Sequence, residues 1–190
     1  MDIRTYFNQR AAHWDDGEQS VDQIRRMIAF LSDIQEGMSV LDVACGTGAM
    51  FEALRERKPS HIKAVDLSEK MIEIAARKVE GDSLFELQCR DLFEMTQETF
   101  DRIIIYNAYP HFMEKDKVVQ KVAELLNPSG RFIVAHGACR EKINGCHTNV
   151  PKEITSGLLS AKEESRLWET CFSIDILIDT EQFYMFSGVK

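Results

Sequence analysis

The residues with the clearest chemical potential are a glycine-containing turn and an acidic residue that follows it. Residues 41–48, LDVACGTG, place small side chains where an apolar run turns sharply, so the backbone can approach a ligand closely. Asp66 stands at the end of the next apolar run, where a carboxylate can accept both hydroxyl hydrogens of a ribose. Turn and acid together predict a nucleotide-type ligand. A plain tight turn with a solvated carboxylate is the alternative.

Three histidines occur where a second reactant would meet that ligand. His111 follows the apolar run 100–106, His136 ends the run 131–135, and His147 lies in the polar segment after it. An imidazole titrates near pH 6.5 and can therefore remove a proton from an acceptor. We expect these three side chains to converge on the acceptor and to deprotonate or orient it.

The segment 136–147 contains more polar, chemically capable residues than a connector needs. We expect a helix-like lid, with His147 and either Asn144 or Arg140 turned inward; a solvent-facing helix and loop is an equal alternative. The three histidines could also bind a metal ion, and Cys139, Cys146 and Cys171 a soft metalloid. Sequence separation does not show convergence, and cysteine is a common core residue, so no metal site is assigned.

Alternating strand and helix patterns position these residues. Apolar strand-like runs occupy 39–43, 61–66, 84–89, 100–106 and 131–135. Helical spacing of apolar residues separates most of them, with Ser68 as a helix N-cap and 127–130 as a closing turn. This alternation predicts a doubly wound α/β fold, mostly parallel, with helices on both faces and ligands at the C-terminal strand ends. Residues 173–179 and 182–189 are separated by a short acidic turn, which predicts an antiparallel hairpin.

The 190 residues suit one domain, which we divide into an N-terminal helical cap (1–36), a cofactor-binding core (37–136), and an acceptor-side segment with the hairpin (137–190). The net charge of −8 argues against a nucleic-acid partner. No apolar run approaches the roughly 20 residues of a membrane span, so no membrane partner is expected. Five cysteines without a CxxC pair fit a reducing, cytoplasmic location. The oligomeric state cannot be read.

In these motifs the sequence resembles the class I methyltransferases that use S-adenosylmethionine (SAM). The resemblance rests on LDVACGTG, AVDLSEKMI, CRDLFEM, FDRIIIYNAYPHF and LNPSGRFIVAHG, and on YFNQRAAHWDD, which looks like a helix that folds over the cofactor. It implies a seven-stranded Rossmann-like sheet, SAM as cofactor and S-adenosylhomocysteine (SAH) as product. Ala44 departs from the glycine that is frequent there, a small-for-small exchange that we expect to leave the turn intact.

The resemblance also implies which residues contact the cofactor. Asp42 and Asn107 would lie near the methionine portion, and Asp66 would bind the ribose hydroxyls. Ala44, Gly46 and Gly48 would allow the backbone to pass close to the cofactor. Leu67 and Met71 would contact the two faces of the adenine, and Asp91 and Leu92 its amino edge. Tyr6, Phe7 and Trp14 would either shield the cofactor or pack as ordinary helix residues.

Three alternatives remain beside methyl transfer to a small-molecule acceptor. A nicotinamide-dependent oxidoreductase would need G-x-G-x-x-G, but Phe51 occupies the third glycine position when the motif starts at Gly46. A nucleic-acid methyltransferase would fit an Asn-Pro-Pro-aromatic motif, which Ala108-Tyr109 breaks. A non-catalytic SAM-binding scaffold would bind SAM without releasing SAH.

Overall fold

The computed structural model describes residues 1–16 and 22–190. Its helices and strands, in chain order, are α1 (Ile3–Asn8), the 3-10 helix η1 (Ala11–His13), α2 (Asp22–Leu31), β1 (Ser39–Val43), α3 (Phe51–Arg55), β2 (His61–Asp66), α4 (Glu69–Lys78), β3 (Phe85–Cys89), η2 (Leu92–Glu94), β4 (Phe100–Tyr106), η3 (Tyr109–His111), α5 (Lys115–Leu125), β5 (Leu126–His136), α6 (Arg140–Cys146), α7 (Ala161–Trp168), β6 (Ser173–Asp179) and β7 (Tyr184–Val189). No helix within the described ranges is both long and apolar enough to cross a membrane.

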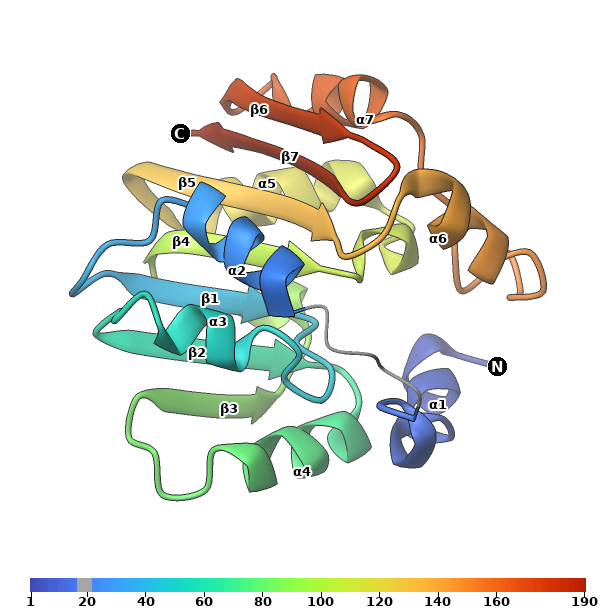
Figure 1. The fold of residues 1–190 in the computed structure, drawn as a ribbon, viewed down its shortest axis with the longest axis horizontal. Helices are drawn as coiled ribbons and strands as arrows, with labels where there is room; N and C mark the ends of the chain where they lie inside the picture. Colours follow the sequence, from blue (N-terminus) through green and yellow to red (C-terminus); the bar gives the residue numbers. More distant parts are fainter. Residues whose placement is uncertain (17–21) are drawn as a thin grey trace.

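The seven strands form one sheet in the order β3-β2-β1-β4-β5-β7-β6 (Figure 1). Strands β1 to β5 pair in parallel, whereas β7 pairs antiparallel with both β5 and β6. The C-terminal ends of the parallel strands therefore share one edge, and α1 and α6 lie beyond it (Figure 1). The predicted doubly wound sheet with its C-terminal hairpin is confirmed.

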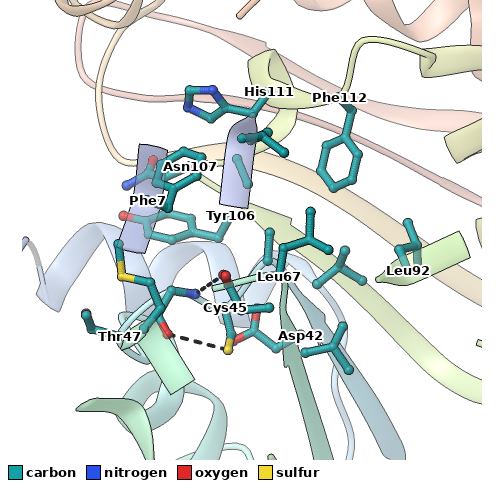
Figure 2. A pocket seen from close by; sticks show the side chains of 18 of the residues that line it. Phe7, Asp42, Cys45, Thr47, Leu67, Leu92, Tyr106, Asn107, His111 and Phe112 are labelled. Atoms are coloured by element: carbon teal, nitrogen blue, oxygen red, sulfur yellow. Dashed lines mark hydrogen bonds between the residues drawn. The ribbon is translucent and has the colours of Figure 1, made fainter. Parts of the chain in front are cut away.

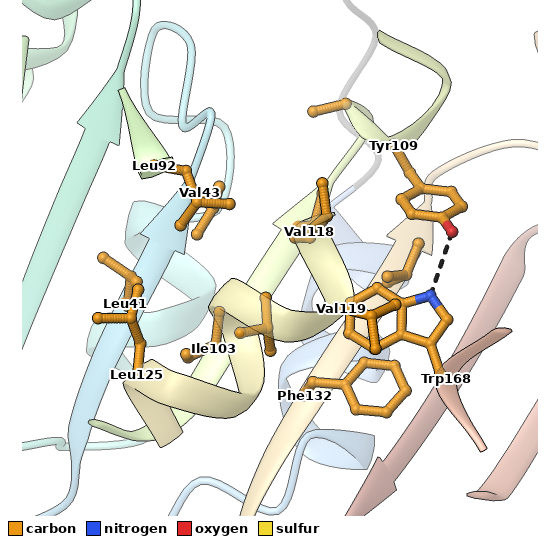
Figure 3. Close-up of a cluster of buried hydrophobic side chains, with 14 of the residues drawn as sticks. Leu41, Val43, Leu92, Ile103, Tyr109, Val118, Val119, Leu125, Phe132 and Trp168 are labelled. Carbon is orange, nitrogen blue, oxygen red and sulfur yellow. Dashed lines mark hydrogen bonds between the residues drawn. The ribbon is translucent and has the colours of Figure 1, made fainter. Parts of the chain in front are cut away.

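Helices cover both faces of the sheet because the central strands are apolar on both sides. In β4, Ile103 and Ile105 pack in the cluster under α5 and α7, while Ile104 packs in the cluster under α2 and α3. Figure 3 shows the first cluster, in which the Trp168 ring stacks on Phe132 with centroids 4.0 Å apart. The Trp168 indole N–H donates to the Tyr109 hydroxyl at 3.1 Å.

The expected cap boundary at residue 36 does not match the packing. Ile28 and Ala29 of α2 are fully buried in the sheet core, so α2 belongs to the core, and of the N-terminal elements α1 and η1 lie at the strand-end edge. Val21, which precedes Ile24 and Ile28 at helical spacing in the sequence, lies outside the described residues.

Strand β5 begins at Leu126, earlier than the expected 131, but residues 127–130 form an irregularity within it rather than a regular ladder. Leu126 pairs with Phe100, and the register then shifts before Arg131 pairs with Arg102. Ser129 takes a left-handed φ of 61° within this irregular stretch, and the backbone N–H of Lys190 donates to Gly130 O at 2.9 Å. The turn tendency of Pro128, Ser129 and Gly130 is thus expressed as a bulge between two paired parts of β5.

Candidate active site

A cavity of about 540 Å³ opens where the parallel strands end, between the N-terminal helices and η3 (Figure 2). It has the size and position expected for a ligand site in a doubly wound sheet. Nine of the ten residues implied as cofactor contacts line it; Gly48 does not. Those nine are Asp42, Ala44, Gly46, Asp66, Leu67, Met71, Asp91, Leu92 and Asn107.

The turn after β1 is built from three left-handed residues. Ala44, Gly46 and Gly48 have φ values of 53°, 55° and 89°. Glycine adopts this conformation without steric strain, whereas a left-handed alanine destabilises the folded state by about 1–2 kcal/mol. The turn therefore forms with Ala44, but the backbone there is strained. At Gly48 a Cβ would lie 2.5 Å from the Phe51 ring, which makes this glycine a packing requirement of α3 rather than a wall of the cavity.

Asp66 is held at the end of β2 by two backbone donors. Its Oδ2 accepts the Gly46 N–H at 2.9 Å, and its Oδ1 accepts the Ser68 N–H at 2.8 Å. Each oxygen keeps a second lone pair for a ligand hydroxyl. Burial raises the pKa of Asp66, and the two N–H bonds oppose that rise. Ser68 also caps α4, as predicted, by accepting the Met71 N–H at 3.1 Å.

Asp42 lines the cavity with a buried carboxyl oxygen that lacks a hydrogen-bond partner in the described part of the chain. It is 1% exposed, and its Oδ2 has no hydrogen-bond partner among the described residues. Burial, reinforced by the nearby charge of Asp66, raises the pKa of Asp42 to about 8. A buried carboxyl without a partner on a cavity wall suits a ligand that brings a positive charge or a hydrogen-bond donor. The residues present therefore fit the cationic methionine end of SAM.

The remaining implied contacts are fixed by local backbone bonds. Asp91 caps η2 by accepting the Phe93 N–H at 2.9 Å. Asn107 has a left-handed φ of 54°, and its Oδ1 accepts the Gly137 N–H at 2.9 Å, which ties the ends of β4 and β5 together. Both residues are thus positioned at the cavity by the strand ends that they follow.

The N-terminal helices close one side of the cavity through polar contacts. The Ser68 hydroxyl donates to Asn8 Oδ1 at 2.6 Å, and the Thr47 hydroxyl donates to Asp15 Oδ1 at 2.6 Å. Phe7 and Trp14 line the cavity with ring centroids 5.5 Å apart, whereas Tyr6 contacts Phe7 from outside the cavity wall. Two of the three aromatic residues suggested as a shield therefore face the ligand space.

The three histidines differ in access to the cavity. His111 lines it, and the Nδ1–H of His111 donates to Ile154 O at 2.8 Å. The His147 ring meets the His111 ring edge-on at 4.9 Å without lining the cavity itself. His136 is 1% exposed, and neither of its ring nitrogens has a partner among the described residues. The structure thus brings His111 and His147 together and places His136 away from the cavity wall.

Burial keeps all three histidines neutral at neutral pH. It lowers the pKa of His111 to about 4 and that of His136 to about 3, and it also lowers the pKa of His147. The charges of His111 and His147 further disfavour a proton on His136. Because the Nδ1–H of His111 is bonded to Ile154 O, the neutral ring has its lone pair on Nε2 and can accept a proton there.

The expected lid segment does form a helix, α6, but its polar residues hold the fold. Asn144 accepts the Leu158 N–H at 2.8 Å and donates to Leu158 O at 3.0 Å, and the Arg140 guanidinium lies 3.2 Å from Asp179. Neither residue lines the cavity. Across the described ranges, no three His, Cys, Asp or Glu side chains gather as a metal site, so neither the histidines nor the cysteines support the metal alternatives.

Sequence reasoning missed the rim of the cavity. Asp15 and Asp16 line it from the N-terminal segment, and Phe112, Met113 and Glu114 line it after η3. The signal available was their position at the end of the N-terminal segment and after η3, but irregular backbone gives no periodicity that would show which side chains point inward.

Comparisons with known proteins agree with this geometry. Residues 40–130 match the methyltransferase domain family. Methyltransferase GfsG from Streptomyces halstedii is 27% identical over 139 residues, which cover 70% of this chain and 49% of GfsG. The chain spans about half the length of the curated relatives it matches.

Two solved structures show the same fold over nearly the whole chain. N-methyltransferase NodS from Bradyrhizobium japonicum, solved with SAH, has a TM-score of 0.76 and 13% identity, covering 100% of this chain and 99% of NodS. A chain from the complex between the Haloferax volcanii Trm112 methyltransferase activator and a methyltransferase has a TM-score of 0.79 and 17% identity, with 96% of both chains covered.

Sheet order, strand-end cavity and matched domain define a class I methyltransferase fold. Residues 40–130 form a methyltransferase domain, as the motifs implied, and the chain shares the fold of SAH-bound NodS. The nicotinamide-dependent alternative is thereby set aside.

Proposed function

We propose that this protein transfers a methyl group from SAM to a small-molecule acceptor by in-line displacement and releases SAH. The observation that carries the proposal is Asp66, whose carboxylate is oriented toward the cavity by the Gly46 and Ser68 N–H groups and keeps acceptor capacity on both oxygens. The SAH complexes among the structural neighbours support the choice of cofactor.

In this proposal the cofactor contacts follow the cavity wall. Asp66 holds the ribose hydroxyls, Leu67 and Met71 cover the adenine, and Asp91 meets its amino edge. Asp42 faces the cationic methionine end, which would supply the partner that its Oδ2 lacks. Bound SAM supplies a methyl group already activated on a sulfonium, so the main task of these residues is positioning.

His111 is the residue that we assign to the acceptor. Because its Nδ1–H is used by Ile154 O, the lone pair of the neutral ring lies on Nε2. A hydroxyl oxygen that attacks the methyl group becomes positive as its new bond to carbon forms, and its proton becomes strongly acidic; the proton of an aromatic amine becomes acidic to a lesser degree. A base with a pKa of about 4 is sufficient for that proton. His147 then orients the His111 ring from its edge.

SAH formation tests the proposal. Purified protein is incubated with SAM carrying a labelled methyl group and with a broad set of small acceptors, and both SAH and labelled product are measured. SAH release that depends on an acceptor supports methyl transfer. Tight SAM binding without SAH release from any acceptor would instead favour a SAM-binding scaffold.

A further inference from the structure

The end of the cavity that faces the acceptor is largely aromatic. Phe7, Phe112 and His111 line it, and the Phe7 ring lies between Trp14, at 5.5 Å, and His111, at 5.0 Å. Figure 2 shows His111 and Phe112 at the opposite end from Thr47 and Asp42. A surface of rings offers large contact area to a flat apolar body and few polar atoms with which to bind a hydrated one.

The charges around this space are predominantly negative. Acidic side chains line the cavity at Asp15, Asp16, Asp66, Asp91 and Glu114, whereas Asp42, with its pKa raised to about 8, adds no charge below that pH. Among the described residues of the lining, Arg90 alone carries a permanent positive charge, and its guanidinium donates to Glu94 O at 2.7 Å and lies 3.5 Å from Glu98. The histidine of the lining is neutral.

The acids on the rim have partners that do not line the cavity. Glu114 pairs with Lys117 and Asp15 with Lys78, and Asp16 is hydrogen-bonded to Nδ1 of His13. These pairs lie near the surface, where solvent screens them, and they reduce the negative potential without reversing it. A carboxylate or phosphate entering the cavity would give up its hydration and find no available cation on the wall.

We infer, on the basis of the proposed function, that the acceptor is an aromatic alcohol or amine that carries no anionic group. Its ring packs against Phe7 and Phe112, and its O–H or N–H donates to Nε2 of His111. On attack, the new bond to the methyl carbon forms as the carbon–sulfur bond breaks, the sulfur keeps that electron pair, and the proton of the acceptor passes to Nε2. Acceptors with a carboxylate or phosphate are rejected by the acidic lining.

The test uses three phenols that differ only in the charge of one substituent. The neutral probe is 4-ethylphenol, the cationic probe is tyramine, and the anionic probe is 4-hydroxyphenylacetate. Binding to the SAH-loaded full chain is titrated by ligand-observed NMR. We expect the neutral and cationic probes to bind at least about tenfold more tightly than the anionic probe, because one like charge near several carboxylates is sufficient for such a difference.

Charge variants separate the acidic rim from other causes of preference. The double variant Asp16→Asn, Glu114→Gln should reduce the ratio of the affinities for tyramine and 4-hydroxyphenylacetate at least twofold. Glu80→Gln removes an exposed carboxylate that does not line the cavity, and it should leave this affinity ratio unchanged. SAH affinity, measured in each variant, reports whether the cofactor site is intact.

The outcomes are distinguishable. The inference is overturned if the anionic probe binds as tightly as the other two probes or more tightly. It is also overturned if the double variant leaves the affinity ratio unchanged. Failure of all three probes to bind while SAH binds also overturns it and leaves the proposed function standing. Failure of SAH itself to bind overturns the proposed function.

Discussion

Binding of SAM should release a proton from Asp42. Burial and the charge of Asp66 raise the pKa of this carboxyl from its ordinary value of 3.8 to about 8, so Asp42 is protonated in the protein without cofactor at pH 6.5. The positive methionine end of SAM would favour the ionised form. If the pKa in the complex falls well below 6.5, roughly one proton leaves for each SAM bound.

The same linkage sets the pH dependence of affinity. Because a proton must leave, SAM affinity should rise by up to about tenfold for each pH unit as pH increases toward 8 and then level off. Calorimetric titration at pH 6.5 in phosphate and in Tris measures the proton release, since the observed heat differs by the ionisation enthalpies of the two buffers. The expected slope corresponds to about one proton.

Asp42→Asn is the matched control. The amide keeps the shape of the side chain and cannot ionise, so proton release at pH 6.5 should disappear and the affinity should lose its rise between pH 6 and 8. This control is needed because the α-amino group of SAM itself titrates near pH 8. A wild-type slope of zero, or an unchanged slope in Asp42→Asn, would refute the assignment of a protonated Asp42 next to the methionine end.

Four further predictions concern single residues. Asp66→Ala removes the ribose acceptor and should weaken SAM binding roughly tenfold or more, as measured by calorimetry, while the melting temperature changes little. Ala44→Gly relieves a left-handed φ of 53° and should raise the free energy of unfolding by about 0.5–1 kcal/mol in urea titrations, since relief of strain exceeds the entropy cost of glycine; a lower stability would show that the turn is not strained. His111→Ala should lower kcat by roughly 10²-fold or more with unchanged SAM affinity, whereas His136→Phe, which replaces two buried nitrogens without partners, should not lower the free energy of unfolding.

The cofactor side of the site was predictable from the sequence because it depends on local pattern. The apolar runs 39–43 and 61–66 each end in a turn or an acid, and parallel strands bring such ends to one edge whatever the rest of the chain does. Nine implied contacts consequently line one cavity. Gly48 was the exception, since the reason for its missing side chain is the ring of Phe51, a contact that no motif shows.

The acceptor side was predictable only in outline, because it depends on the register of strands far apart in the sequence. His136 was correctly placed at the end of β5, but its pairing opposite Tyr184 of β7 places it in the interior, where it is 1% exposed. His111 lines the cavity instead of the interior because β4 has ended before it. The backbone turns through η3, and the His111 ring then donates to Ile154 O. Both histidines lie near the C-terminal end of a strand, yet only one of the two, His111, has access to the cavity.

Because the three histidines differ in access to the cavity, they could act on an acceptor only in different ways. A residue that the acceptor can touch must line the cavity, which only His111 does. His147 can act on the acceptor only through the ring that it contacts at 4.9 Å, and His136 only through the electrostatic field that it shares with both. A charge on His147 disfavours a proton on His111, and a charge on either of them disfavours a proton on His136. Because the pKa of His111 is about 4, a proton that it gains during methyl transfer should pass on to solvent at neutral pH.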